Sequence, residues 1–254
     1  MFSGLRQAVV ALARGCYGLY AWLLFVLLAG STWLVILVQR DPIRRRRTVR
    51  SCARLLLNGL GIRVSFYGSR HLLAARPCLV VANHTSYLDA VIMIALLPED
   101  VQFVAKQGLA EHWITRSFLR AIGTAFVARP KGPVGKGGTR HLIALIQAGH
   151  SLIVFPEGTF QAEPGLQPFH RGTFVTAACT GTPVIPLAIR GARRALPEGA
   201  WIPRPGVITV AVGEPLRASG RDDRAIAHLL NEAFLAILRL SDGSETGEFT
   251  ERAA

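Results

Sequence analysis

Residues Cys78–Asp89 read CLVVANHTSYLD, and this stretch decides the class of fold. Its first part, Cys78–Ala82, is a short apolar run typical of a strand that is buried on both faces of a parallel sheet. The polar residues after it would form a loop, and Asp89 would lie in the first turn of the next helix. A strand, a loop and a helix in succession form the basic unit of an α/β fold.

Further apolar runs of similar length recur along the chain. Two segments have helical periodicity: Thr139–Ala148, which stops at Gly149, and the amphipathic Asp222–Leu240. The sequence therefore predicts an α/β fold with a largely parallel or mixed sheet flanked by helices. The additional strands are expected at Val101–Ala105, Ala125–Ala128, Leu152–Phe155, Val184–Ile189 and Val207–Val212.

One segment near the start of the chain is suited to a membrane. Gly15–Gln39 contains no charged residue, and as a helix its central part, Leu19–Val38, would match a hydrocarbon core about 30 Å thick. A cleaved signal peptide fits less well, because the run is too long and no A-x-A site ends it. Two arrangements stay open: a spanning helix, or a helical hairpin in one leaflet that is broken at Gly30 and Ser31.

The chain is also strongly basic, with a net charge of +13. Seven arginines follow the apolar segment, whereas only Arg6 and Arg14 precede it, so the positive-inside rule places the bulk of the protein in the cytoplasm, at an inner or plasma membrane. Because the cluster adjoins an apolar helix, anionic lipid head groups are its expected partner, and nucleic acid is not. The seven residues are Arg40, Arg44, Arg45, Arg46, Arg47, Arg50 and Arg54.

These patterns divide the chain into three parts. Residues 1–54 would form the membrane anchor and a basic juxtamembrane segment, residues 55–240 the globular domain, and residues 241–254 a polar, acidic, disordered tail. The four cysteines are far apart in sequence and are expected to be small buried side chains rather than zinc ligands. They are Cys16, Cys52, Cys78 and Cys179.

The most informative polar residues are His84 and Asp89. A histidine just beyond the carboxyl end of a buried strand lies where open α/β sheets place their active sites. A carboxylate on one imidazole nitrogen fixes the tautomer and makes the other nitrogen a better base. This pair brings no nucleophile of its own, so it suits a reaction in which a substrate hydroxyl attacks. The alternative is a structural histidine beside an aspartate that caps a helix.

Three further blocks lie at the ends of predicted strands: Gly123–Arg129, Phe155–Thr159 and Val184–Leu187, the last of which begins its strand. Arg129 follows one strand and can bind a phosphate through two hydrogen bonds, and Lys106 after another strand supplies a second cation. Glu157, in a Phe-Pro-Glu-Gly-Thr turn, can accept a hydrogen bond from a substrate hydroxyl. The carboxyl ends of parallel strands gather at one edge of a sheet, so these groups are expected near His84. Lys131–Gly138 contains glycines and lysines but lacks the Walker A spacing, and is interpreted as a loop.

Taken together, the blocks resemble the four motifs of the PlsC-type 1-acyl-glycerol-3-phosphate acyltransferase family, also called lysophospholipid or glycerolipid acyltransferases. The resemblance covers about Cys78–Pro215. The matching blocks, in chain order, are His84-x4-Asp89, Gly123-x-x-Phe126-x-x-Arg129, Phe155-Pro156-Glu157-Gly158-Thr159 and Val184-Ile185-Pro186.

The resemblance implies an enzyme that moves a fatty acyl group from acyl-CoA or acyl-carrier protein to the free hydroxyl of a lysophospholipid. The simplest acceptor is lysophosphatidate, which would give phosphatidate at a membrane. His84 would be the general base and Asp89 would orient it, with no metal and no bound cofactor. Ser86 is interpreted as a local hydrogen-bonding residue. The acceptor would be bound by Gly123, Phe126, Arg129, Glu157, Gly158 and Thr159, with Lys106 in a supporting phosphate role.

One position departs from the family pattern. The third motif commonly continues with an arginine, and here that position is Phe160. Arg171, beside His170, could replace the missing cation. Alternatively, the acceptor is another lysolipid, such as a lysophosphodiester or an aminolipid. A non-catalytic lipid-binding membrane adaptor with the same fold is the third possibility.

Overall fold

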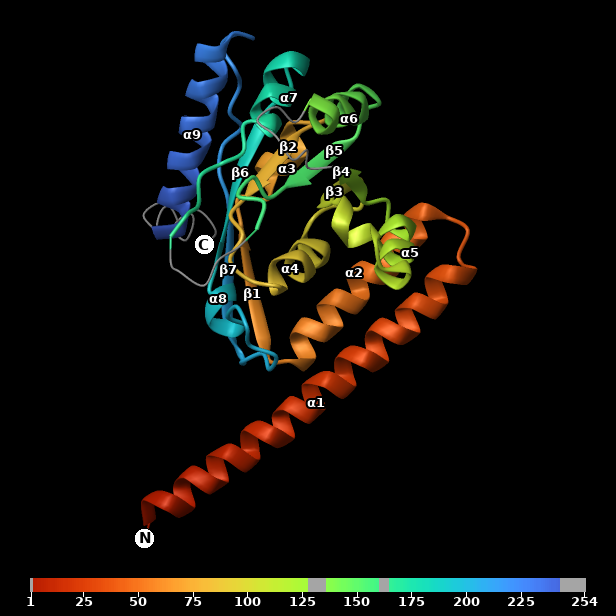
Figure 1. Ribbon diagram of the computed structural model, residues 1–254, viewed down its shortest axis with the longest axis vertical. Helices are drawn as coiled ribbons and strands as arrows, with labels where there is room; N and C mark the ends of the chain where they lie inside the picture. The colour runs from red at the N-terminus through yellow and green to blue at the C-terminus, as the bar shows by residue number, and fades with distance from the viewer. Residues whose placement is uncertain (1, 128–135, 160–164, 243–254) are drawn as a thin grey trace.

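A mixed sheet of seven strands forms the centre of the computed structural model, which describes residues 2–127, 136–159 and 165–242 (Figure 1). The strands are β1 (Ile62–Tyr67), β2 (Leu79–Ala82), β3 (Val101–Lys106), β4 (Ala125–Val127), β5 (Ser151–Val154), β6 (Val184–Arg190) and β7 (Gly206–Val212). Their order across the sheet is β1-β7-β6-β2-β5-β3-β4. The predicted α/β fold with a mixed sheet is confirmed. β1 is absent from the strands that the sequence predicts, because Arg63 and Ser65 interrupt its apolar pattern.

The direction of the strands determines which loops meet. β6, β2, β5, β3 and β4 run parallel to one another, whereas β7 runs antiparallel to β6 and pairs in parallel with β1. Leu79 of β2 lies opposite both Leu152 of β5 and Val184 of β6. The loops that follow β2, β5, β3 and β4 therefore leave the sheet at the same edge.

Helices cover both faces of the sheet and bury one apolar cluster on each (Figure 1). β2 serves both clusters, since Val80 and Ala82 face one and Leu79 and Val81 face the other, which explains its uninterrupted apolar sequence. The first face carries α2 (Pro42–Gly59), α3 (Arg70–Ala74), α4 (Leu88–Leu96) and α8 (Ala192–Ala195); the second carries α6 (Lys136–Gln147), α7 (Gly172–Thr180) and α9 (Asp223–Asp242). The short η1 (Gln107–Ala110) and α5 (Trp113–Ala121) connect β3 to β4.

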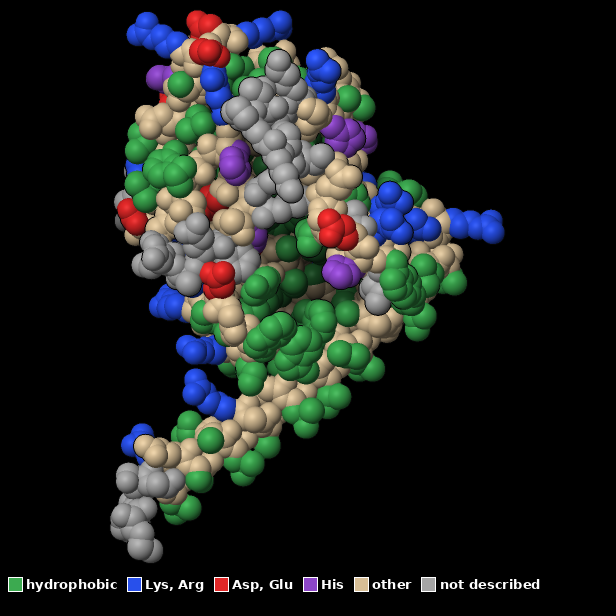
Figure 2. All heavy atoms as spheres, viewed as in Figure 1, with side chains coloured by type: hydrophobic (Ala, Val, Ile, Leu, Met, Phe, Trp, Pro, Cys, Tyr) green, Lys and Arg blue, Asp and Glu red, His purple; other side chains and the backbone are tan. Residues whose placement is uncertain are grey.

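The first helix, α1 (Phe2–Val38), extends well beyond the rest of the molecule (Figure 1). It continues without interruption through Gly30 and Ser31, so of the two open alternatives the hairpin broken at these residues is wrong. By length and composition it is the one helix within the described residues that could cross a membrane. Its outer face is largely apolar and exposed, as Figure 2 shows along its length.

The inner face of α1 packs along α2. The hydroxyl groups of Tyr17 and Tyr20 donate hydrogen bonds to the carbonyl oxygens of Leu60 (2.9 Å) and Gly59 (3.0 Å). Ala21 of α1 belongs to the same buried cluster as Leu56 of α2. The two helices therefore pack side by side along the length of α2, and residue 54, after which the domain boundary is expected, lies inside α2. At the other end of the chain, Ser241 and Asp242 continue α9, and residues 243–254 of the expected tail lie outside the described residues.

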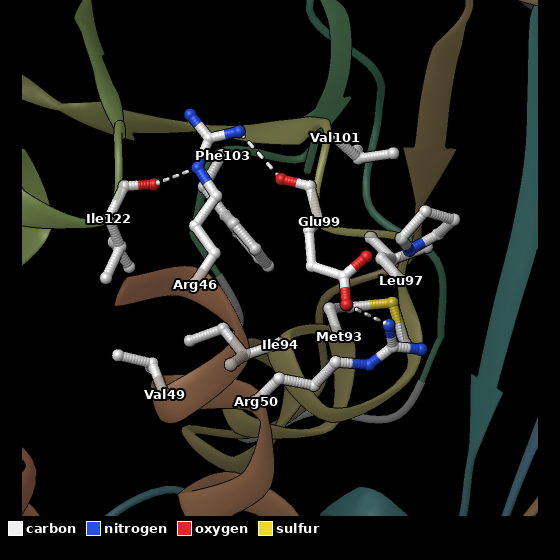
Figure 3. Close-up of a pocket in the computed structure, with 11 residues that line it drawn as sticks. Arg46, Val49, Arg50, Met93, Ile94, Leu97, Glu99, Val101, Phe103 and Ile122 are labelled. Atoms are coloured by element: carbon white, nitrogen blue, oxygen red, sulfur yellow. Dashed lines mark hydrogen bonds and ion pairs between the residues drawn. The ribbon is translucent and has the colours of Figure 1, made fainter. Parts of the chain in front are cut away.

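Arginines of α2 bind the end of α4, and Figure 3 shows two of them reaching toward Glu99 and its neighbours. Arg46 donates to the carbonyl oxygens of Ile122 (3.0 Å) and Glu99 (2.7 Å), and burial lowers its pKa. Arg50 donates to the Leu96 carbonyl and to the Glu99 carboxylate, both at 3.1 Å. Arg54 likewise donates to the Ala95 carbonyl at 2.9 Å. The expectation that the whole basic cluster faces lipid is therefore wrong for these three residues, because they satisfy carbonyl groups at a helix end.

Replacing Arg50 with methionine should lower the free energy of unfolding by about 1–3 kcal/mol, because the last carbonyls of α4 and the Glu99 carboxylate lose a charged donor. Arg44→Met is the matched control, since the Arg44 side chain is 78% exposed and forms an ion pair with Asp41 at 3.6 Å. Thermal unfolding of both variants in the same detergent would measure the difference. Equal midpoints for the two variants would contradict a structural role for Arg50.

The cysteines only partly follow expectation. Cys78 is buried and Cys52 is half-buried, but Cys16 and Cys179 are exposed. The prediction of four buried side chains is wrong for the last two. Cys16 lies on a part of α1 that extends past its contacts with α2, and Cys179 lies in the last turn of α7.

Candidate active site

Two loops lie side by side at the carboxyl-end edge of the sheet. His84 follows β2, and Phe155–Gly158 follow β5, the parallel neighbour of β2. The Phe155 ring stacks on the His84 imidazole with centroids 4.5 Å apart and an angle of 29° between the planes. The structure thus brings the first and third sequence blocks together, as parallel strand ends should.

The His84 imidazole is held by Asp89. Nδ1 of His84 lies 2.8 Å from Oδ2 of Asp89, and the same oxygen accepts hydrogen bonds from the backbone N–H groups of Thr85 (2.6 Å) and Ser86 (2.8 Å). Asp89 is fully buried in the first turn of α4, where the helix dipole favours a carboxylate. With Nδ1 donating to the carboxylate, Nε2 is the ring nitrogen that accepts a proton. The His84 side chain is 20% exposed.

Two side chains on either side of His84, those of Asn83 and Ser86, fix the loop. The sequence did not predict the hydrogen-bond partner of either one. The amide of Asn83 donates to the Ile189 carbonyl (3.0 Å) and accepts from the Ile189 N–H (2.7 Å), which ties the loop to β6. The hydroxyl of Ser86 donates to the Leu196 carbonyl (2.8 Å) and accepts from the Leu88 N–H (3.1 Å). The interpretation of Ser86 as a local hydrogen-bonding residue is confirmed, and it also reaches the segment after α8.

Glu157 connects the two loops through backbone groups. Its Oε1 accepts the His84 N–H at 2.6 Å, and its Oε2 accepts the Gln167 N–H at 2.8 Å. The side chain is only 7% exposed, and burial raises the pKa of the carboxyl group, although both backbone hydrogen bonds act in the opposite direction. These contacts tie the Glu157 side chain to the backbone of the His84 loop, so we expect it to position His84; its expected contact with the acceptor stays a prediction.

Replacing Glu157 with glutamine should lower kcat about 10–100-fold with little change in the KM for the acceptor, because an amide can accept only one of the two N–H groups and turns a donor toward the other. Glu232→Gln, on the exposed surface of α9, is the control. Steady-state kinetics of both variants separate the two roles. A rise in acceptor KM at unchanged kcat would instead indicate direct substrate binding by Glu157.

The remaining expected site residues are only partly described. Gly158 is half-buried with a positive φ of 75°, and Thr159 is exposed beside it. Lys106 is the last residue of β3, at the same sheet edge, and Phe126 pairs with Ala105 in β4. Arg129 and Phe160 lie outside the described residues.

Three other positions that the sequence analysis singled out contact groups other than His84. Gly123 has a φ of 77° and lies against the Arg46 guanidinium, where a β-carbon would collide. Arg171, the suggested replacement cation, forms an ion pair with Asp223 at the start of α9. Val184–Pro186 begins β6 and pairs with Leu79–Val81 of β2, so it lies within the sheet, beside the strand that precedes His84.

The site therefore contains a candidate base, His84, whose imidazole is held by the buried Asp89 carboxylate. A second carboxylate, that of Glu157, fixes the backbone at His84. Such a pair removes a proton from a hydroxyl that is brought to Nε2. Among the described residues, no group of three His, Cys, Asp or Glu side chains could hold a metal ion.

Comparisons with known proteins point to one kind of chemistry. The family model described as Acyltransferase matches residues 63–190. Relatives include a chloroplastic 1-acyl-sn-glycerol-3-phosphate acyltransferase of Brassica napus, 29% identical over 58% of this chain and 42% of its own length. Another is the lyso-ornithine lipid O-acyltransferase of Pseudomonas aeruginosa, 31% identical over 62% of this chain and 58% of its own. The chain spans less than two thirds of the length of either relative.

A solved structure shares the fold. The crystal structure of the 1-acyl-sn-glycerophosphate acyltransferase PlsC from Thermotoga maritima superposes with a TM-score of 0.72 at 22% identity. The match covers 91% of this chain and 97% of that one. The similarity therefore includes the N-terminal helices as well as the sheet.

Proposed function

Because the chain belongs to the acyltransferase family, we propose that it transfers a fatty acyl group from a thioester to the free hydroxyl of a lysophospholipid. The observation that carries the proposal is the His84–Asp89 contact of 2.8 Å at the edge of the sheet, beside the Glu157 loop. A lipid-binding adaptor without catalysis would have no need for a base held in this way.

In the proposed reaction, Nε2 of His84 takes the proton from the acceptor hydroxyl while its oxygen attacks the thioester carbonyl carbon. The new C–O bond gives a tetrahedral oxyanion, which collapses as the C–S bond breaks. The thiolate leaves with the proton that His84 carried, so the histidine returns to its neutral form. Asp89 stabilises the imidazolium between the two proton transfers. All of this needs a bound acyl donor but no metal and no resident cofactor.

Lysophosphatidate is the first choice of acceptor, because several relatives carry the name 1-acyl-sn-glycerol-3-phosphate acyltransferase. Lys106, Arg129, Gly158 and Thr159 would bind its phosphoglycerol part. A lyso-aminolipid is the second candidate, because one relative is a lyso-ornithine lipid O-acyltransferase. Two features favour this second candidate over an acceptor with a phosphate monoester. Phe160 stands where the family commonly has an arginine, and the Arg171 side chain is already paired with Asp223.

A membrane location would suit such acceptors, and α1 supports it. The packing of α1 along α2 favours an in-plane position in one leaflet. Cys52 and Gly59 of α2 lie beside Leu28 and Tyr20 of α1, so a perpendicular α1 would draw the exposed Arg54 between them into hydrocarbon. The catalytic part would face the cytoplasm at the inner or plasma membrane. There, the net charge of +13 would attract acyl-CoA and acyl-carrier protein, which are both acidic.

A panel of mass-tagged lysolipids, each offered with acyl-CoA and with acyl-carrier protein, tests the proposal. The purified protein should acylate at least one of them, and the mass of the product identifies the acceptor and the donor. Turnover of lysophosphatidate would support the first choice, and turnover of a lyso-aminolipid alone would support the second. Binding of vesicles without any thioester turnover would favour the adaptor.

A further inference from the structure

The loop between α8 and β7 carries large apolar side chains on its surface. Trp201 is 75% exposed and Ile202 is 41% exposed. The loop is nevertheless well anchored, since the Arg204 N–H donates to the Ala195 carbonyl (2.7 Å) and the Ala200 N–H to the Pro197 carbonyl (3.1 Å). An ordered loop that holds a tryptophan in solvent is unusual, because burial of such a ring contributes strongly to stability.

This loop adjoins the exposed face of α1. The Trp201 ring lies beside that of Trp22, with centroids 6.5 Å apart and planes at 30°. Ile202 lies against Gly18, where a β-carbon would be 2.8 Å from the Ile202 Cδ1 atom. The residues around Trp22 on α1 are themselves exposed and apolar, so the loop extends that apolar surface onto the globular part. Figure 2 shows hydrophobic side chains along α1 and next to it on this face. The α1 residues are Leu19, Leu23 and Val26.

The charge around the apolar residues is mainly positive. Arg194 and Arg204 are exposed on either side of Trp201, against one exposed acidic residue, Glu198. Tryptophan favours the interface between head groups and hydrocarbon, and arginine next to it favours anionic head groups. An acidic bilayer surface therefore matches both the apolar and the charged parts of the loop.

The same loop is bonded to the catalytic segment. Ser86, whose N–H binds Asp89, donates its hydroxyl hydrogen to the Leu196 carbonyl at 2.8 Å. Ser86 is fully buried, so this bond is protected from water. The position of the loop and the position of His84 are therefore linked through one side chain.

We propose that residues 196–205 form a second membrane contact, in which Trp201 and Ile202 enter the interface of an anionic bilayer beside α1. The contact brings the mouth of the His84 site to the surface where a lysolipid lies. The membrane contact stands independently of the reaction, but its effect on turnover rests on the proposed acyl transfer.

The first test measures how deeply the Trp201 ring enters the bilayer and needs no activity assay. In the full chain, Trp22, Trp33 and Trp113 are replaced by phenylalanine, which leaves Trp201 as the single tryptophan. Vesicles of phosphatidylglycerol and phosphatidylcholine, brominated near the head-group end of the acyl chains, should quench its fluorescence and shift its emission to the blue. Unquenched emission from protein that sediments with the vesicles would overturn the proposal, as would a shift produced by soluble acyl-carrier protein alone.

The second test measures how loss of the Trp201 ring changes membrane binding and turnover. Trp201→Ser should lower partitioning into these vesicles about tenfold, and it should lower turnover of vesicle-borne lysolipid but not of the same lysolipid in detergent micelles. Trp201→Phe should restore most of both. Leu235→Ser, an exposed apolar residue of α9, is the control and should change neither. Equal loss of turnover in vesicles and in micelles would overturn the proposal, because it would assign the loop a purely structural role.

Discussion

Replacement of His84 by alanine is expected to lower the rate of acyl transfer by about 10²–10⁴-fold, the usual contribution of a general base. The imidazole contacts Asp89 through Nδ1 and stacks on the Phe155 ring, so the variant removes the proposed base and leaves its neighbours in place. The fold should be retained, because the loop is held by Asn83 and by Glu157, which binds the backbone N–H of residue 84. Product formation is measured with the acceptor and donor that the lysolipid panel identifies.

The matched control is His228→Ala. His228 is exposed on α9 and pairs with Glu232 at 3.2 Å, so its removal tests whether loss of any histidine lowers the rate. Full activity is expected for this variant, with an unchanged unfolding midpoint for both. A folded His84→Ala protein that turned over at the wild-type rate would contradict the proposed base.

The second large effect is expected for Asp89→Asn. All three hydrogen bonds to this side chain converge on Oδ2, so an amide oxygen at that position can accept each of them. The substitution therefore removes the negative charge and keeps these three hydrogen bonds, while its Nδ2 group takes the place of the buried Oδ1, which has no hydrogen-bond partner among the described residues. Without that charge the imidazolium formed during proton transfer loses its counter-ion, and the rate should fall by about 10²–10⁴-fold.

Asp89→Ala separates charge from structure. It should lose activity to a similar extent and should also unfold more easily, by about 1–3 kcal/mol, since buried N–H groups lose their acceptor. Circular dichroism during heating measures the stability of both variants. If Asp89→Asn kept wild-type turnover, the carboxylate would serve as a helix-end acceptor alone, which is the structural alternative for this pair.

Much of the fold and the central pair could be predicted because they depend on local sequence. β2 is a continuous apolar run because both of its faces are buried, and its neighbours in the sheet have the same property. His84 and Asp89 lie in one strand-to-helix connection, so a spacing of five residues is enough to predict that they meet. α1 can be recognised by its length and lack of charge.

The sequence by itself determined the α/β class, the apolar first helix and the residues of the base pair, because each follows from short-range periodicity or spacing. Only the tertiary structure decided the partners of Glu157, Arg46 and Arg50, and the contact of Ser86 with Leu196. These groups bind backbone carbonyl or N–H groups, most of them more than 40 positions away. Every residue offers a backbone carbonyl and every residue except proline an N–H, so the amino-acid sequence carries no signal for which of them a distant polar side chain will bind.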